Sequence, residues 1–84
     1  MERFSFEVRG AAGLHARPAA DLVACAQQFA CNIELSLGSE HCDAKRIFGV
    51  LGLDAGQGDT VVVTCEGSDE HEARMTLEQL AQEL

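Results

Sequence analysis

Segments with the periodicity of a β-strand alternate with segments that have the periodicity of a helix, all within 84 residues. Apolar and polar residues alternate in three short segments, and a Gly-Ser turn predicts that a further strand pairs with the second of them as a hairpin. The predicted strands cover residues 4–9, 32–37, 40–43 and 60–66. So short a chain has room for one core, and we predict a single domain over residues 1–84.

Three other segments have helical spacing. Apolar residues recur on one face from Pro18 through Ala30, and because proline is tolerated in a first helical turn, this helix should begin within residues 15–18. Residues 44–53 are apolar and hold two glycines, which fits a weak helix or a strand, and we predict a short helix. Asp69, followed three residues later by a glutamate, predicts a capping box at the start of a last helix.

The order of these segments limits the fold class. It reads β-α-β-β-α-β-α, and strands interleaved with helices in a short chain favour an α+β fold. We predict a two-layer, open-faced β-sandwich, in which a four-stranded antiparallel sheet carries three helices on one face. The polar residues of the alternating segments should then face solvent on the other side of the sheet.

Charge and the first residues exclude several classes of protein. The net charge is −8, from 14 acidic and 6 basic residues, which argues against a nucleic acid or an anionic membrane as the partner. The opening "MERFSFEVRG" alternates apolar and polar positions and fits neither a signal peptide nor a membrane span. We therefore expect a cytoplasmic protein.

The cysteines and histidines predict no metal site. The four cysteines form no CxxC pair, and in a reducing compartment such thiols behave as small hydrophobic residues. His41 and Cys42 are adjacent and would point to opposite faces of a strand, so they should not bind one ion. We expect neither a metal nor another cofactor.

The stretch "GLHARPAA", residues 13–20, places His15 and Arg17 at a predicted helix start. A helix N-terminus presents unpaired N–H groups and the positive end of the helix dipole, which together favour a bound anion. That dipole and the guanidinium should also keep the imidazole neutral and therefore nucleophilic. A neutral His15 could accept a phosphoryl group, which the same donors and Arg17 would then hold.

The residues alone leave other interpretations of His15 open. A lone histidine at a helix start is commonly a cap or a partly buried polar residue, and a single arginine is usually a solvated charge. A small enzyme with His15 as general base is a further possibility. We disfavour it because the chain is too short for a deep pocket and shows no second titratable partner near residue 15.

"GLHARPAA" closely resembles the phosphorylation-site motif of the HPr family, the histidine-containing phosphocarriers of the bacterial phosphoenolpyruvate-dependent phosphotransferase system. "DAKRIFGVLGL", "GDTVVVTCEG" and "DEHEA" resemble the second helix, the last strand and the start of the last helix of that family. The resemblance thus covers nearly the whole chain. It implies that His15 takes a phosphoryl group at Nδ1 from enzyme I and passes it to the IIA component of a sugar-specific permease. It also implies a phosphate site formed by Ala16, Arg17 and Pro18.

The same resemblance implies a docking surface on the first two helices of a relay protein with no small-molecule turnover of its own. A relay that must show the same face to successive partners is most simply a monomer. This surface would comprise Ala16, Ala20, Lys45, Arg46, Ile47, Phe48 and Leu51. Of the apolar residues between 47 and 51, we expect Phe48 to serve docking and Val50 to belong to the core.

Two departures from the family pattern are evident. Arg46 stands where many relatives have a serine that a regulatory kinase modifies, so this form of control should be absent. Ala24, Gln27 and Gly49 occupy positions where relatives often carry lysines, which should slow association with enzyme I or change its salt dependence. A regulatory relative, or a nitrogen-related or dihydroxyacetone phosphorelay protein, remains an alternative.

Overall fold

Four strands and three helices alternate along the chain in the computed structural model, which describes residues 1–84. The elements are β1 (Glu2–Glu7), α1 (Ala16–Ala26), β2 (Asn32–Leu37), β3 (Glu40–Asp43), α2 (Ile47–Leu53), β4 (Thr60–Glu66) and α3 (Glu70–Ala81). The predicted element order and the α+β fold are confirmed, including the short helix α2. No helix of the structure combines the length and the apolar character that a membrane crossing needs.

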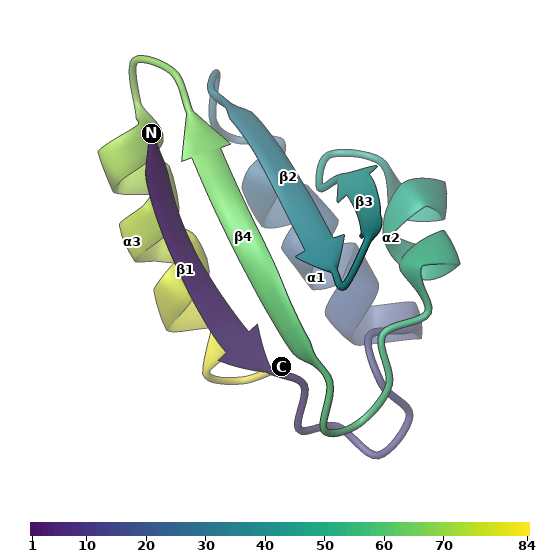
Figure 1. The fold of residues 1–84 in the computed structure, drawn as a ribbon. Helices are drawn as coiled ribbons and strands as arrows, with labels where there is room; N and C mark the ends of the chain where they lie inside the picture. The colour runs from purple at the N-terminus through teal and green to yellow at the C-terminus, as the bar shows by residue number, and fades with distance from the viewer.

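The sheet has the strand order β1-β4-β2-β3, and every neighbouring pair is antiparallel (Figure 1). Phe4, Val63 and Leu35 lie in register across β1, β4 and β2 and are buried. The helices α1 and α3 lie behind the sheet, while α2 lies beside the β3 edge and packs against α1 and β3 (Figure 1). The opposite face of the sheet carries polar residues such as Ser5 and Glu34 and is open to solvent, as expected.

The first helix ends earlier than its apolar pattern predicts. α1 stops at Ala26, and Ala30, expected on its buried stripe, is exposed. The carboxylate of Asp69 accepts hydrogen bonds from the N–H groups of Ala30 (2.8 Å) and Cys31 (2.9 Å). These bonds hold the chain in the turn that leads into β2, so residue 30 cannot continue the helix.

The capping box predicted at Asp69 is wrong for the same reason. Asp69 occupies the N-cap position of α3, but its side chain makes no capping hydrogen bond because its oxygens are bonded to the loop before β2. A different carboxylate secures this end of the helix: Glu70 accepts a hydrogen bond from the N–H of Gly67 at 3.1 Å. Asp69, which the local pattern predicts to cap α3, instead binds the loop before β2.

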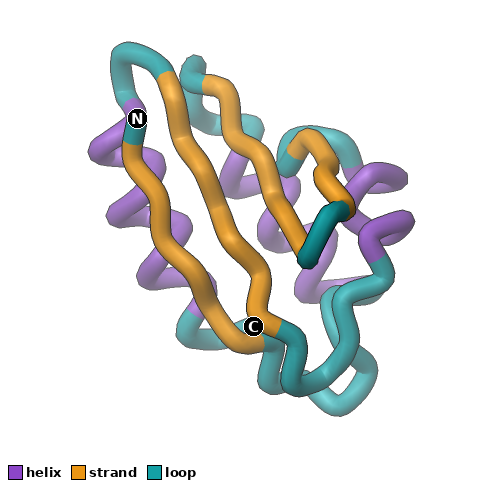
Figure 2. Tube along the Cα trace, viewed as in Figure 1, coloured by secondary structure: helices purple, strands orange, loops and turns teal.

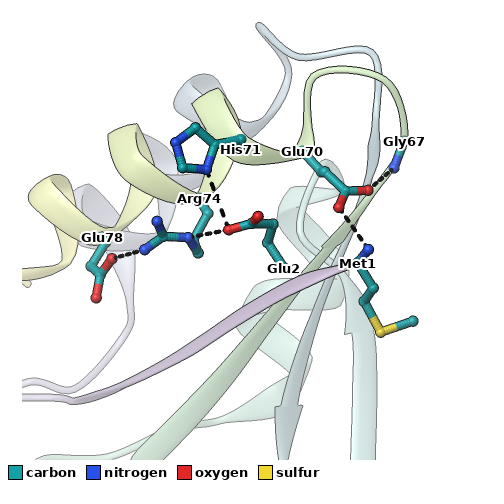
Figure 3. A network of polar contacts seen from close by, with 7 residues as sticks. All are labelled: Met1, Glu2, Gly67, Glu70, His71, Arg74 and Glu78. Atoms are coloured by element: carbon teal, nitrogen blue, oxygen red, sulfur yellow. Dashed lines mark hydrogen bonds and ion pairs between the residues drawn. The ribbon is translucent and has the colours of Figure 1, made fainter.

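A network of charged groups fastens β1 to α3 (Figure 3). Arg74 donates to the carboxylate of Glu2 and, at 2.6 Å, to that of Glu78. Glu70 also pairs with the N-terminal ammonium at 2.6 Å. Because β1 is an edge strand, these contacts hold in place a strand that has only one neighbour in the sheet.

The network and the Asp69 contacts predict a loss of stability in acid. The hydrogen bond from Arg74 lowers the pKa of Glu2, the N-terminal ammonium lowers the pKa of Glu70, and the N–H of Ala30 lowers the pKa of Asp69. A carboxyl whose folded pKa lies below its unfolded value adds stability above the unfolded value of about 4, and that stability is lost as the pH falls through the folded value. We expect the Tm to fall steadily between about pH 4.5 and pH 2 in thermal unfolding scans.

The variant Asp69→Asn isolates one of these groups. It should have a lower Tm than the parent at pH 7 and a smaller decrease in Tm on acidification, since its amide does not titrate. Equal acid dependence in the two proteins would show that Asp69 does not contribute.

Candidate functional site

His15 lies directly before the first residue of α1, so the helix begins where the sequence predicts. Its backbone is extended (φ −124°, ψ 168°), and its side chain makes no capping hydrogen bond. The imidazole is 40% exposed. His15 is therefore a partly buried polar residue, and its side chain does not cap the helix.

The start of α1 offers backbone donors beside this ring. The N–H groups of Ala16 and Arg17 have no acceptor within the chain, as expected at a helix N-terminus. Pro18 has no N–H, so it can only shape the helix start. Ala16 has φ 49°, in the left-handed region, which costs a non-glycine residue about 1–2 kcal/mol. Such strain persists where the surrounding structure imposes it.

Arg17 is exposed and takes part in no ion pair or side-chain hydrogen bond within the chain. Its guanidinium is thus available to an external anion. A guanidinium group binds phosphate through two parallel hydrogen bonds. One phosphate could therefore accept hydrogen bonds from Arg17 and from the N–H groups at the helix start.

The structure adds one acidic residue to the site. Oδ1 of Asp54 lies 3.0 Å from Nε2 of His15, so the expectation that no second titratable group lies near His15 is wrong. Asp54 follows the last residue of α2 and has a left-handed backbone (φ 54°, ψ 41°). Aspartate is one of the few residues other than glycine that adopt this conformation, although glycine is the usual residue after a helix. Its pairing with a residue 39 positions away carries no local signal.

The residues expected to dock partners lie on α1, on α2 and just before α2. Ala16 and Ala20 are exposed on α1, and Arg46 is exposed before α2. Lys45 is half-buried, and its Nζ donates to the carbonyl of Phe29 at 2.7 Å, so its ammonium also secures the loop after α1.

The apolar residues of α2 divide as expected between surface and core. Phe48 is 84% exposed, whereas Val50 is fully buried. Ile47 and Leu51 are half-buried and pack against the core with one side. α1 and α2 pack against each other, so the two helices that carry these residues are neighbours.

The cysteines lie away from this site. Cys31 and Cys65 are buried in the core, Cys25 and Cys42 are half-buried, and all four are free thiols. Burial, aided by the nearby Asp69, raises the pKa of Cys31 to about 11. This thiol is therefore protonated at neutral pH and acts as an apolar core residue.

The family model of the PTS HPr component phosphorylation site matches residues 2–83, nearly the whole chain. The chain belongs to the HPr family. Members of this family are phosphocarriers of the phosphotransferase system, and so long a match gives this chain the same function. Its histidine, arginine and helix start lie in the segment that resembles the HPr phosphorylation motif.

HPr proteins of known sequence and structure support this assignment. Phosphocarrier protein HPr of Lysinibacillus sphaericus is 39% identical over 84 residues, which cover 100% of this chain and 96% of the relative. The crystal structure of HPr from Thermoanaerobacter tengcongensis matches with a TM-score of 0.93 at 36% identity, over 98% of this chain and 92% of that one. A crystal structure of an HPr dimer from the same organism matches with a TM-score of 0.79 at 36% identity, over 99% and 95% of the two chains.

Proposed function

We propose that His15 is the residue that carries the phosphoryl group, and that it takes this group from phospho-enzyme I and passes it to IIA components. The observation that carries the proposal is the position of the partly exposed imidazole beside two unpaired backbone N–H groups and the unpaired guanidinium of Arg17. A phosphoryl group on this ring would meet three sets of donors that have no other acceptor.

The transfer itself needs little from the protein beyond positioning. Nε2 of His15 is occupied by Asp54, so Nδ1 is the ring nitrogen without a partner in the chain. Its lone pair attacks the phosphorus, the new N–P bond forms, and the N–P bond of the donor breaks with its electron pair returning to the donor imidazole. The N–H groups of Ala16 and Arg17, with the guanidinium, stabilise the charge on the phosphoryl oxygens.

The proposed docking surface extends along α1 and α2 from His15, at the N-terminal end of α1, to Lys45 and Arg46, which lie before α2 near the C-terminal end of α1. It comprises Ala16, Ala20, Lys45, Arg46, Ile47, Phe48 and Leu51. An aromatic ring as exposed as that of Phe48 stabilises the free protein little, and a transient partner that buries it would gain apolar contact area. Arg46 has no hydroxyl group, so a kinase specific for serine at this position has no target.

Features of the chain also favour a relay role over an enzyme with its own substrate. None of the three hollows on the surface is lined by His15, so the His15–Asp54 pair faces no enclosed substrate site.

We further propose that the protein works in the cytoplasm as a monomer. The IIA component that accepts its phosphate would decide between a sugar, nitrogen-related or dihydroxyacetone branch.

The test is incubation of the purified protein with phosphoenolpyruvate and enzyme I. A mass increase of one phosphate that disappears in acid supports the proposal, because phosphohistidine is acid-labile and phosphoserine is not. An unchanged mass with active enzyme I would contradict it.

Arg17→Ala should slow transfer from the phosphorylated protein to IIA by roughly tenfold or more, since a charge-assisted bidentate contact is lost. Its Tm should stay close to that of the parent because the exposed side chain makes no hydrogen bond or ion pair within the chain. Arg3→Ala is the matched control, since it removes the same charge from the open face of the sheet, far from α1. Equal transfer rates for Arg17→Ala and Arg3→Ala would refute the assigned role.

A further inference from the structure

The loop after β1 and the loop before β4 are locked together next to His15, and Figure 2 shows them side by side. The N–H of Leu14 donates to the carbonyl of Ala55 at 2.8 Å, and both residues are fully buried. Gly13 lies so close that a Cβ at its position would be 2.5 Å from the same carbonyl oxygen. The backbones that carry His15 and Asp54 are therefore fixed relative to each other.

The conformation of Asp54 is fixed from the side of α2 as well. Its left-handed backbone ends the helix, and its N–H donates to the carbonyl of Leu51 at 3.1 Å. The preceding Leu53 is buried. The carboxylate consequently leaves a rigid helix end, and it meets the imidazole at 3.0 Å between Oδ1 and Nε2.

This contact determines which ring nitrogen can react. An ionised carboxylate only accepts hydrogen bonds, so Nε2 of a neutral His15 must carry the proton and Nδ1 the lone pair. Neither side chain has another polar partner in the chain. No other group in the protein therefore selects the tautomer or the orientation of this ring.

We propose that Asp54 is a positioning residue for the phosphoryl transfer, an inference that rests on the proposed role of His15. It holds the ring as the Nε2–H tautomer, with Nδ1 presented to the donor phosphorus. As the Nδ1–P bond forms, the ring gains positive charge while the Nε2 proton stays in place, and the carboxylate offsets that charge. In the reverse direction the same proton keeps the ring a good leaving group, so the pair serves both uptake and donation.

The effect should be moderate in size, because the side chain of Asp54 is 82% exposed and solvent screens such pairs. We expect uptake from phospho-enzyme I to slow by about fivefold when the carboxylate is removed. That change is well within the resolution of a rapid-quench assay.

Two substitutions test the proposal without unfolding the protein. Asp54→Asn keeps the shape of the side chain but can either accept from Nε2 or donate to it, and Asp54→Gly removes the side chain at a backbone conformation that glycine adopts freely. Asp21→Asn is the matched control, since it removes an equal charge from an exposed position of α1 and has no contact with His15. Thermal unfolding of all variants verifies that they are folded.

Two readouts are needed, the uptake rate and the ¹⁵N spectrum of the neutral, unphosphorylated ring. In the parent and in Asp21→Asn, we expect the two ring nitrogens of His15 to have widely separated shifts, with the proton on Nε2. In both Asp54 variants the shifts should approach each other and uptake should slow.

Parent-like rates and spectra in Asp54→Asn and Asp54→Gly would overturn this inference while leaving the proposed function intact. A parent protein that takes up no phosphate would overturn the proposed function. In that case the ring spectra would still show whether Asp54 selects the tautomer.

Discussion

His15→Ala is expected to abolish phosphate uptake completely while leaving the fold intact. Alanine has no nucleophilic atom, and backbone donors and Arg17 alone cannot form a covalent bond to phosphorus. The imidazole is 40% exposed and its one polar partner is a surface carboxylate, so its loss should change the free energy of unfolding by less than about 1 kcal/mol. Mass spectrometry after incubation with enzyme I, together with a thermal scan, measures both effects.

The other two histidines of the chain provide matched controls. His41 and His71 are exposed and, like His15, each lies close to a carboxylate. His41 lies in the strand β3, away from any helix N-terminus. His71 lies in the first turn of α3, but that turn carries Glu70 and Glu72, which repel a phosphoryl group, and the nearby Arg74 is already paired with Glu2 and Glu78. His41→Ala and His71→Ala should therefore be phosphorylated like the parent. Phosphate uptake by His15→Ala, or its loss in either control, would show that another residue is the acceptor.

Gly13→Ala should cause a large loss of stability, because both the backbone conformation and the space at this position exclude a side chain. Gly13 has φ 77°, and its Cβ would lie 2.5 Å from the carbonyl oxygen of Ala55 and 3.0 Å from Cα of Gly56. Both contacts are with backbone, which cannot rotate away as a side chain can. Backbone strain and the forced separation of the two loops together should cost about 3 kcal/mol, or a decrease in Tm of roughly 10–20 °C.

Gly38→Ala separates the two causes of that loss. Gly38 also has a positive φ, 60°, but no atom lies within 4 Å of a Cβ at its position. It should therefore show only the conformational cost, about 1 kcal/mol. Equal destabilisation of the two variants would mean that the close approach of Gly13 to Ala55 does not matter. Because this approach also sets the position of Asp54, Gly13→Ala should slow phosphate uptake in the protein that remains folded.

The last three strands and the start of the first helix could be predicted because their signals are local, whereas β1 begins and ends two residues before its predicted limits. Alternation of polar and apolar residues identified the buried row that includes Val63 and Leu35, and Pro18 limited the helix start to a few residues. The strands follow from the period-two alternation of apolar residues, and the helix start follows from the missing N–H of proline. Contacts with distant parts of the chain alter neither signal.

The end of the first helix and the capping box could not be predicted because one tertiary contact overrides both local patterns. Ala30 continues an apolar stripe and Asp69 stands where a cap belongs, yet the two residues bind each other across 39 positions of sequence. A hydrogen bond of this kind depends on the packed arrangement of α1, β2 and α3, which no window of neighbouring residues describes.

The candidate site likewise has one part that could be predicted from the sequence and one part that could not. His15, Arg17 and the helix start are contiguous, so their shared chemistry was evident in the motif. Asp54 comes from the far end of α2, and it reaches His15 where the hydrogen bond between Leu14 and Ala55 joins two distant loops. Asp54 could therefore be assigned to the site only once the three-dimensional structure was known.

The measurement that tests the central claim most directly is a ³¹P–¹⁵N correlation spectrum of the ¹⁵N-labelled protein after phosphorylation by enzyme I. The pairing of Nε2 with Asp54 and the free donors at the start of α1 predict one phosphoryl group, bonded to Nδ1 of His15. A phosphorus coupled to Nε2, or to a ring nitrogen of His41 or His71, would contradict this account of the site.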